Sequence, residues 1–295
     1  MKPEWLKIRG SSLKERDEVM QMLADLKLNT VCQEAACPNM VECFGRRTAT
    51  FMILGATCTR GCTFCNVAEG IPSSIDENEV LSVAVAVKKL NLSHVVVTSV
   101  TRDDLEDGGA GHFANTIKAI KELNQETSIE VLIPDLKGKP SALETVMNAM
   151  PAIIAHNIET VESLYSRVRP QANYKRSLEV LSFVKKRGDN IYTKSGMMLG
   201  LGESFDQIIQ VLRDLRSVEC DLLTVGQYLA PTKQHYPIER YVHPNEFEEI
   251  KKHALKMGFL HVASGPLVRS SYHADDAMKS TNISKTISNL TDEIV

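Results

Sequence analysis

The sequence lacks the features that would direct it to a membrane or to nucleic acid. It has no run of about 18 apolar residues that could span a bilayer. Residues 1–10 show neither the apolar centre of a signal peptide nor a transit-peptide pattern. The formal net charge of the 295 residues is only −3, so no excess of one sign favours nucleic acid or an anionic lipid surface. We therefore expect a cytoplasmic protein with no nucleic-acid and no membrane partner.

Cysteine is almost absent outside one short part of the chain. Of the seven cysteines, all but Cys220 lie between positions 32 and 65. A small secreted protein would use such crowding for disulfides, but this chain is long and has no export signal. Intracellular thiols stay reduced, so clustered cysteines there more often bind metal. Cys220 follows a predicted helix and is expected to be a small buried side chain.

Seven short apolar runs rich in β-branched residues predict the strands of the fold. Each is continuous enough to be buried on both faces, as strands of a parallel sheet are. The runs cover residues 49–54, 94–100, 129–134, 152–157, 191–199, 222–229 and 259–264.

Segments with helical periodicity separate these runs. In the clearest one the apolar residues of 205–215 share a face, and Ser204 with Gln207 forms a capping-box signature before it. Another, beginning near Leu178, ends in three basic residues and Gly188. Further helices are expected at about 77–90, 112–125, 141–149, 160–167 and 245–257.

The alternation of strands and helices predicts an α/β fold with a parallel sheet and right-handed crossovers. Six or seven such units suit a partial TIM barrel of the (β/α)6 type. A Rossmann fold is the alternative, but no G-x-G-x-x-G follows the first strand. We expect an N-terminal extension over residues 1–47, a barrel over 48–274 and a polar tail over 275–295.

Cys58, Cys62 and Cys65, here called the first triad, have the spacing C-x3-C-x2-C directly after the first predicted strand. In barrels this end of the strands carries the active site. Soft thiolates suit iron–sulfur clusters, and three of them would leave one iron of a 4Fe–4S cluster open. A zinc site is the alternative, but structural zinc takes a fourth ligand and no histidine lies nearby.

The first triad, with Phe64 before its last cysteine, resembles the motif of the radical S-adenosylmethionine superfamily. The resemblance implies that the open iron binds S-adenosylmethionine, whose reductive cleavage releases a 5′-deoxyadenosyl radical. Such a radical takes hydrogen from unactivated carbon, and the protein positions the substrate for it.

Two further segments resemble cofactor-binding parts of that superfamily. Residues 196–203 are similar to the pattern G-x-I-x-G-x-x-E, which implies that Gly196, Met198 and Gly200 lie beside adenine. A glycine-rich turn without ligand is the alternative. Asn157 and Glu159 follow the fourth predicted strand, where superfamily enzymes often contact the ribose or methionyl group; simple capping of the strand end is the alternative.

Cys32, Cys37 and Cys43, here called the second triad, have the spacing C-x4-C-x5-C. A disulfide would leave one thiol over, and zinc would again lack a fourth ligand. A second 4Fe–4S cluster is the economical interpretation.

Segments spread along nearly the whole chain resemble the lipoyl synthase family. They are residues 2–6, 32–43, 58–65, 98–109, 156–160, 168–170, 194–203, 226–232, 262–266 and 269–274. The resemblance implies that the second triad holds an auxiliary cluster that is consumed as a sulfur source. It implies Ser271 as the fourth ligand, although from the residues alone Ser271 would be an ordinary turn hydroxyl. Arg269 is expected to screen the cluster or position that serine, and a surface salt bridge is the alternative.

The same resemblance implies the substrate and partners. Sulfur would enter at C6 and C8 of an octanoyl group on a lysine of a lipoyl carrier domain, in a 2-oxoacid dehydrogenase E2 subunit or the glycine cleavage H protein. An electron donor such as ferredoxin or flavodoxin and an iron–sulfur carrier are also implied. Alternatives are a methylthiotransferase, which would favour an RNA-binding module or basic patch, and a non-catalytic iron–sulfur carrier.

The remaining polar candidates carry weaker signals. Arg102, Asp103 and Asp104 follow the second predicted strand and are expected to form an ion-paired loop. The eight histidines lack ligand spacing and are expected to be solvated or hydrogen-bonded structural residues.

Overall fold

A curved sheet of eight strands organises the part of the chain that the computed structural model describes, residues 2–6, 13–34, 37, 39–45, 50–188, 190–272, 274 and 276. The strand order is β1-β2-β5-β6-β7-β8-β9-β10, and every pair from β2 to β10 is parallel. The parallel strands are β2 (Thr50–Ile53), β5 (His94–Ser99), β6 (Ser128–Leu132), β7 (Ile153–Ala155), β8 (Tyr192–Leu199), β9 (Leu222–Gln227) and β10 (His261–Gly265). These seven correspond to the seven predicted runs, so the predicted α/β partial barrel is confirmed.

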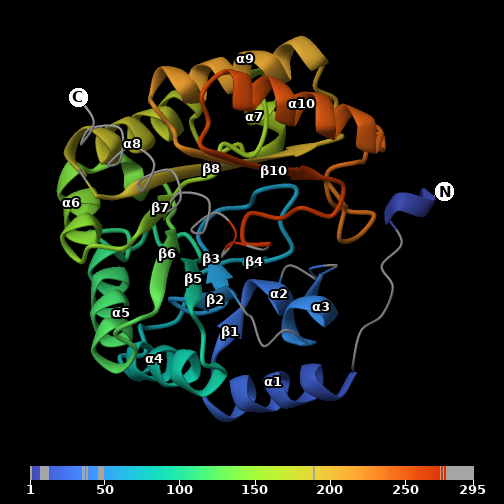
Figure 1. Cartoon of the computed structure of the whole chain (residues 1–295). Coiled ribbons are helices and arrows are strands. Elements are labelled where there is room, and N and C mark those ends of the chain that lie inside the picture. Colours follow the sequence, from blue (N-terminus) through green and yellow to red (C-terminus); the bar gives the residue numbers. More distant parts are fainter. Residues whose placement is uncertain are drawn as a thin grey trace, which may run out of the picture.

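Helices cover the convex face of the sheet (Figure 1). They are α4 (Asn78–Leu90), α5 (Ala110–Leu123), α6 (Pro140–Asn148), α7 (Tyr165–Val168), α8 (Tyr174–Arg187), α9 (Phe205–Ser217) and α10 (Pro244–Lys256), with short 3-10 turns at Leu136–Gly138 and Glu162–Leu164. At the start of α9 the Ser204 side chain accepts from Gln207 N, and the Gln207 side chain accepts from Ser204 N. The predicted capping box is therefore confirmed, as is the end of α8 at Gly188.

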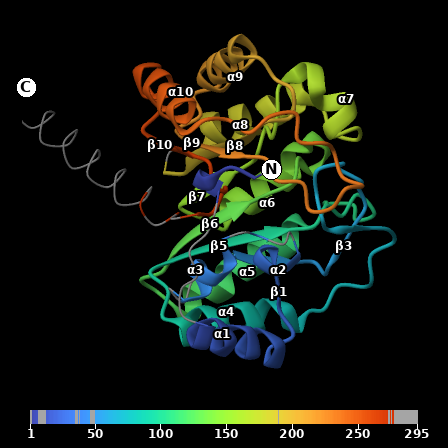
Figure 2. The same cartoon turned by 90° about the vertical axis from the view of Figure 1, so that its right-hand side faces the viewer.

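The barrel is partial because β2 and β10 do not pair with each other. Figure 2 faces this open side, where α2 (Val31–Glu34) and α3 (Met40–Gly45) lie, with α1 (Leu13–Asp25) below them. β1 (Asn29–Thr30) pairs antiparallel with β2 and joins these N-terminal helices to the sheet. β1 was not expected, since a two-residue strand shows no periodicity. The turn Glu4–Leu6 begins the described chain, and the predicted tail after 274 lies outside the described residues except for Asp276.

Alternate residues of a strand serve two different environments, because strand side chains point to opposite faces in turn. Val95 and Val97 of β5 belong to the hydrophobic core under the helices. His94 and Val96 line a cavity together with the second triad. The outward faces of the strands therefore hold the fold together, and the inward faces are available for chemistry.

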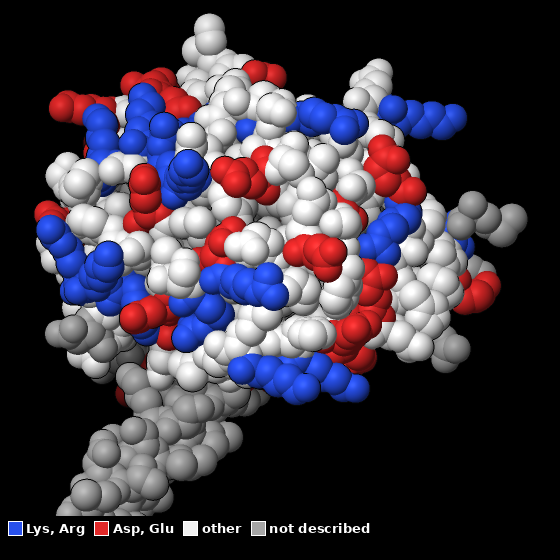
Figure 3. Space-filling model, turned by 90° about the horizontal axis from the view of Figure 1, so that it is seen from above, with Lys and Arg blue, Asp and Glu red and all other residues white. Residues whose placement is uncertain are grey.

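The surface shows no large field of one charge on the face drawn in Figure 3, which lies above α9 and α10 of Figure 1. Lys and Arg side chains lie among Asp and Glu side chains there. Among the described residues, the structure contains no helix with the length and apolar character that crossing a bilayer requires.

Candidate functional site

The loop of the first triad leaves β2 at the carboxyl end of the sheet. Two short strands, β3 (Thr57–Cys58) and β4 (Ala68–Glu69), pair parallel to each other and bring the two ends of the loop together. Cys58 Sγ accepts hydrogen bonds from the backbone N–H groups of Arg60 at 3.4 Å and Thr101 at 3.3 Å. Hydrogen bonds to the sulfur are one of the features that tune an iron-bound thiolate.

Segments that follow three other strands hold this loop in place. After β5, Thr101 O accepts from Thr59 N at 3.0 Å. After β7, Val168 O accepts from Thr63 N at 3.1 Å, and after β9, Tyr236 N donates to Thr63 O at 2.9 Å. The three thiols are thus fixed by the barrel rather than by the loop alone.

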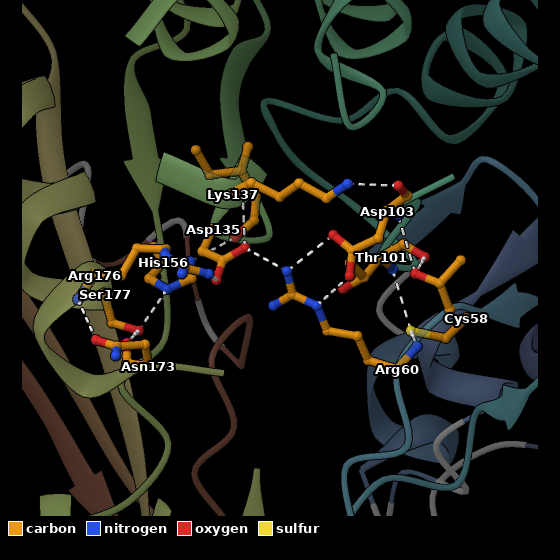
Figure 4. Close-up of polar contacts among 12 residues, drawn as sticks. Cys58, Arg60, Thr101, Asp103, Asp135, Lys137, His156, Asn173, Arg176 and Ser177 are labelled. Atoms are coloured by element: carbon orange, nitrogen blue, oxygen red, sulfur yellow. Dashed lines mark hydrogen bonds and ion pairs between the residues drawn. The ribbon is translucent and has the colours of Figure 1, made fainter. Parts of the chain in front are cut away.

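A buried arginine between the first two cysteines joins the loop to β5 and β6 (Figure 4). The Arg60 side chain is 7% exposed; its Nε donates to Asp103 Oδ2 at 2.6 Å and its Nη2 to Asp135 Oδ1 at 2.8 Å. Burial alone would raise the pKa of Asp135, but Arg60 lowers it to about 2. The expected ion-paired loop is also present, since Arg102 Nη2 pairs with Asp104 at 2.8 Å. The sequence does not reveal the Arg60 link, because its partners lie one and two strands away.

We predict that Arg60→Gln lowers the free energy of unfolding by about 3 kcal/mol, since it leaves the buried Asp135 carboxylate with a weaker partner. The matched control is Arg176→Gln, because Arg176 pairs with the same carboxylate at 3.3 Å but its side chain is 36% exposed. That control should cost less than about 1 kcal/mol. Urea unfolding of the metal-free proteins measures both values; equal losses would contradict the account.

Four of the predicted cofactor-side residues come together at the ends of β7 and β8. Glu159 N donates to Gly196 O at 2.9 Å, and Met198 N donates to Glu159 O at 2.8 Å. Asn157 Nδ2 donates to Glu159 Oε1 at 3.0 Å. A Cβ on Gly196 would lie 2.8 Å from Asn157 Oδ1 and 2.6 Å from Thr224 Oγ1, so only glycine lets these two side chains lie this close to β8. Glu159 has a φ of +64°, a costly conformation that often marks a functional site.

Arg169 belongs to the same group and was not among the predicted residues. Its Nη1 donates to Asn157 O at 3.0 Å and Tyr165 Oη at 3.1 Å. It also interacts with Cys62 and Glu159. Asn157 Oδ1 and Arg169 Nε are buried without a hydrogen-bond partner among the described residues. An amide oxygen and a guanidinium nitrogen left over beside the first triad fit the amine and carboxylate of a bound amino acid.

The other two predicted cofactor-side residues have different surroundings. Phe64 is half-buried and packs against the hydrophobic core that contains Leu199 and Tyr228. Gly200 lies in the turn after β8 with a φ of +96°, and its N–H donates to Glu203 Oε1 at 2.7 Å. A Cβ there would lie 2.3 Å from Gln227 Nε2, so the turn itself requires this glycine.

His156, next to Asn157, is a hydrogen-bonded structural residue, as expected of the histidines. Its Nδ1 lies 2.9 Å from Ile133 O and its Nε2 3.0 Å from Ser177 Oγ. Burial lowers its pKa from 6.5 to about 4, and the nearby Arg169 charge adds to this shift.

We predict that His156 makes stability depend on pH between about 6.5 and 4. Between these values the unfolded chain binds a proton that the folded chain does not, so folding free energy is lost as the pH falls. Urea unfolding of the metal-free protein should show a contribution of about 2 kcal/mol lost between pH 7 and pH 5. His156→Gln should remove that part of the pH dependence. An unchanged pH dependence in the variant would contradict the prediction.

The second triad and Ser271 line one cavity of about 270 Å³. Asn39, Glu42, Thr50, His94, Arg269 and Tyr272 are among the other lining residues. Ser271 lines this cavity although it lies 228 positions after Cys43 in the sequence. The fold therefore brings together the four residues that the family resemblance implied as ligands.

Thr50, the first residue of β2, connects two of these four. Its hydroxyl donates to Ser271 Oγ at 2.7 Å. Its backbone and hydroxyl also hydrogen-bond the Cys32 thiol. A single residue at the start of β2 thus brings an N-terminal cysteine and a C-terminal serine to the same point.

The C-terminal segment that carries Ser271 is attached to the N-terminal helices. Asn39 Nδ2 donates to Leu267 O at 2.7 Å. Tyr272 Oη donates to the Glu42 carboxylate, at 3.0 Å from both oxygens. These contacts close the open side of the barrel between α3 and β10.

The buried cysteines are better suited to bind iron than to exist as free thiolates. Burial raises the pKa of Cys32 to about 11 and that of Cys65 to about 12, and it raises the pKa of Cys37 and Cys62 as well. Such thiols become ligands when a metal takes the place of the proton. None of the seven cysteines, all of which are described, forms a disulfide. Among the described residues no three Cys, His, Asp or Glu side chains converge on one point as around a single ion; ligands of separate irons in a cluster need no such convergence.

Comparison with known proteins gives a consistent result. The family model of the Radical SAM superfamily matches residues 52–215. Lipoyl synthase of Caldicellulosiruptor saccharolyticus is 58% identical over 278 residues, which cover 94% of this chain and 98% of that protein. Lipoyl synthase of Alkaliphilus metalliredigens is 54% identical over 278 residues, 94% of this chain and 96% of that protein.

Solved structures share the fold at low sequence identity. The crystal structure of methylornithine synthase has a TM-score of 0.57 and 16% identity, and the match covers 84% of this chain and 78% of that chain. This likeness supports the barrel alone. The superfamily match over more than half of the chain, with relatives more than half identical along almost its whole length, shows that the chain belongs to the lipoyl synthase family of the radical S-adenosylmethionine superfamily.

Proposed function

We propose that this iron–sulfur enzyme, which uses S-adenosylmethionine as its family does, inserts two sulfur atoms at C6 and C8 of a protein-bound octanoyl group. The observation that carries the proposal is the cavity in which the second triad meets Ser271. Three thiols and a hydroxyl are a donor set for a four-iron cluster with one weak ligand. A chain that only cleaved S-adenosylmethionine would need no such second site.

The first triad would hold a 4Fe–4S cluster with one open iron. When loaded and reduced, this cluster with S-adenosylmethionine supplies the 5′-deoxyadenosyl radical that takes hydrogen from the substrate carbon. The chain's part is to orient the cofactor. The buried Asn157 Oδ1 would accept from the methionyl amine, and Arg169 would pair with the methionyl carboxylate.

The other cofactor-side residues would shape the adenosine pocket. Gly196 would keep the Asn157 side chain close to β8, because a Cβ there would lie 2.8 Å from Asn157 Oδ1, and Met198 lies two residues further along the same strand. Phe64 would support the loop of the first triad from the core side. Glu159, joined to Gly196 and Met198 through its backbone, would contact the ribose or the methionyl group.

The second triad and Ser271 would hold the auxiliary 4Fe–4S cluster, which acts as the sulfur-donating substrate. Oxygen binds the irons of a soft-ligand cluster less well than thiolate does, so Ser271 is the ligand most easily released. Thr50, which already donates to Ser271 Oγ, can stabilise the serine oxygen once it leaves iron. Arg269 lines the cavity and carries a positive charge near Cys37, which would balance the anionic cluster.

The octanoyl group would arrive on a lysine of a lipoyl carrier domain, from a 2-oxoacid dehydrogenase E2 subunit or the glycine cleavage H protein. Ferredoxin or flavodoxin would supply electrons, and an iron–sulfur carrier would rebuild the auxiliary cluster. We place these events in the cytoplasm. We assign auxiliary-cluster binding to an extension over residues 1–47 and to the barrel's C-terminal segment, with the barrel over 48–274 and the tail over 275–295.

Anaerobic incubation of the reconstituted protein with dithionite, S-adenosylmethionine and an octanoylated peptide tests the proposal. Mass spectrometry should find 5′-deoxyadenosine together with peptide that has gained two sulfur atoms as a dithiol, with its number of hydrogens unchanged. Peptide that carries no sulfur, in the presence of 5′-deoxyadenosine, would contradict the sulfur-insertion proposal. Absence of both products would contradict radical chemistry as a whole.

A further inference from the structure

His94 is the first residue of β5 and lines the same cavity as the second triad and Ser271. Its side chain is 5% exposed, so it is almost completely removed from solvent. It lies on a strand that carries none of the four proposed ligands. The cavity therefore has a polar side chain on a wall that the proposed function leaves unused.

Neither ring nitrogen of His94 has a hydrogen-bond partner among the described residues. One carboxylate oxygen, Glu130 Oε2, lies 3.5 Å from Nε2, which is longer than an ordinary hydrogen bond, and Nδ1 has no such neighbour. A buried imidazole without any hydrogen bond is costly, because it loses water and gains no replacement. This exception to the expected hydrogen-bonded histidines needs an explanation.

Glu130 faces only one ring nitrogen of His94, Nε2, and it also binds Lys194. Lys194 Nζ donates to its two carboxylate oxygens at 2.8 and 3.0 Å, and both side chains are almost fully buried. Burial alone would raise the pKa of Glu130, but the Lys194 ammonium lowers it. The Glu130–Lys194 pair therefore lies on the Nε2 side of His94, and Nδ1 is left for a group on the cavity side.

The proposed occupant of the cavity offers only hydrogen-bond acceptors. Thiolate sulfurs, bridging sulfides and a serine oxygen have lone pairs and no hydrogen to give. A ring nitrogen that meets them must be the protonated one. Hydrogen bonds from nitrogen to cluster sulfur raise the reduction potential and are among the main means by which a protein tunes a cluster.

We propose that His94 is a further residue of the sulfur-donating site, and that its Nδ1–H donates a hydrogen bond to a sulfide or thiolate of the auxiliary cluster. The inference rests on the proposed function, because it presumes that a cluster occupies the cavity. The bond holds the cluster in place after Ser271 dissociates.

The test uses the full chain with the first triad replaced by Ala, so that only the auxiliary cluster is observed. In this background His94 is replaced by Phe, which keeps the ring shape and removes the donor, or by Asn, whose amide restores a donor near the Nδ1 position. His94→Met replaces Phe if that variant does not fold, as judged by circular dichroism. Each protein is reconstituted with iron and sulfide, and iron is counted.

Two measurements follow: the midpoint potential of the cluster, and the rate at which a chelator removes its iron. Removal of the donor should lower the midpoint potential and speed iron loss about tenfold, the usual size of such second-layer effects. The Asn variant should recover most of both values. Equal potentials and equal rates in all variants would overturn the inference while leaving the proposed function intact.

Failure of the proposed function would give a different result from failure of the His94 inference. If the background protein with His94 unchanged binds no iron–sulfur cluster, then the second triad is not a cluster site and the proposal falls before any His94 variant is compared. If it binds about four irons, the expected content of one cube, the His94 comparison decides the inference alone.

Discussion

Replacement of all three cysteines of the second triad by Ala is expected to abolish lipoyl product while S-adenosylmethionine is still cleaved. The two triads occupy different parts of the fold. The first lies in the loop after β2 and is held by segments that follow β5, β7 and β9, whereas the second lines the cavity at the open side of the barrel. Loss of the second triad should therefore leave the surroundings of the first triad unchanged.

Three measurements define this result. Iron should fall from about eight to about four per chain, 5′-deoxyadenosine should still form, and sulfur-bearing peptide should fall below detection. Replacement of the first triad should instead abolish both products. Cys220→Ala is the matched control, because Cys220 is fully buried in the hydrophobic core away from the cavity, as the sequence predicted. Formation of dithiolated peptide by the second-triad variant would show that its sulfur source lies elsewhere.

The substitution Gly226→Ala, which adds a single methyl group, is expected to reduce auxiliary-cluster binding almost as strongly. A Cβ at this position of β9 would lie 2.1 Å from Val268 O, so the backbone of the segment that carries Ser271 must move. Overpacking of this kind against the main chain should cost about 3 kcal/mol of unfolding free energy. The displaced Ser271 would no longer meet the second triad, so the auxiliary cluster should be lost preferentially.

Gly265→Ala provides the control for this substitution. Gly265 pairs with Gly226 in the β9–β10 register, but its Cβ would lie 3.5 Å from Val268 Cγ2, an ordinary contact. Iron analysis and urea unfolding of the two variants should therefore differ: about four irons and a large loss for Gly226→Ala, about eight irons and little loss for Gly265→Ala. Equal behaviour would mean that close packing at Gly226 does not position the serine.

The strands and most helices could be predicted from the sequence because their signals are local. Runs such as that of β5 are apolar and β-branched on consecutive positions, and the capping box of α9 lies within four residues. β1, β3 and β4 could not be predicted, because a strand of two residues is too short to show an alternating pattern of apolar and polar side chains. Their existence depends on neighbours brought close by the rest of the fold.

The residues of the candidate site also fall into two groups: those that could be predicted from the sequence and those that could not. The two triads have recognisable spacings, and the resemblance to a family supplied Ser271, which no spacing could. The roles we give to Arg60, Arg169 and His94 follow from partners that lie on other strands: Asp135 for Arg60, Asn157 for Arg169, and the cavity for His94. A sequence shows each of these residues but not what stands opposite it.

The isotopic origin of the inserted sulfur decides whether the auxiliary cluster is the sulfur donor. The protein is reconstituted with iron and ³⁴S-sulfide, freed of excess sulfide, and given one equivalent of octanoylated peptide with S-adenosylmethionine and dithionite in the presence of ³²S-sulfide. If the auxiliary cluster is the donor, the product carries two ³⁴S atoms, and the second-triad variant forms none. A product that carries ³²S would mean that sulfur enters from solution, and the cavity of Ser271 and the second triad would not be the source.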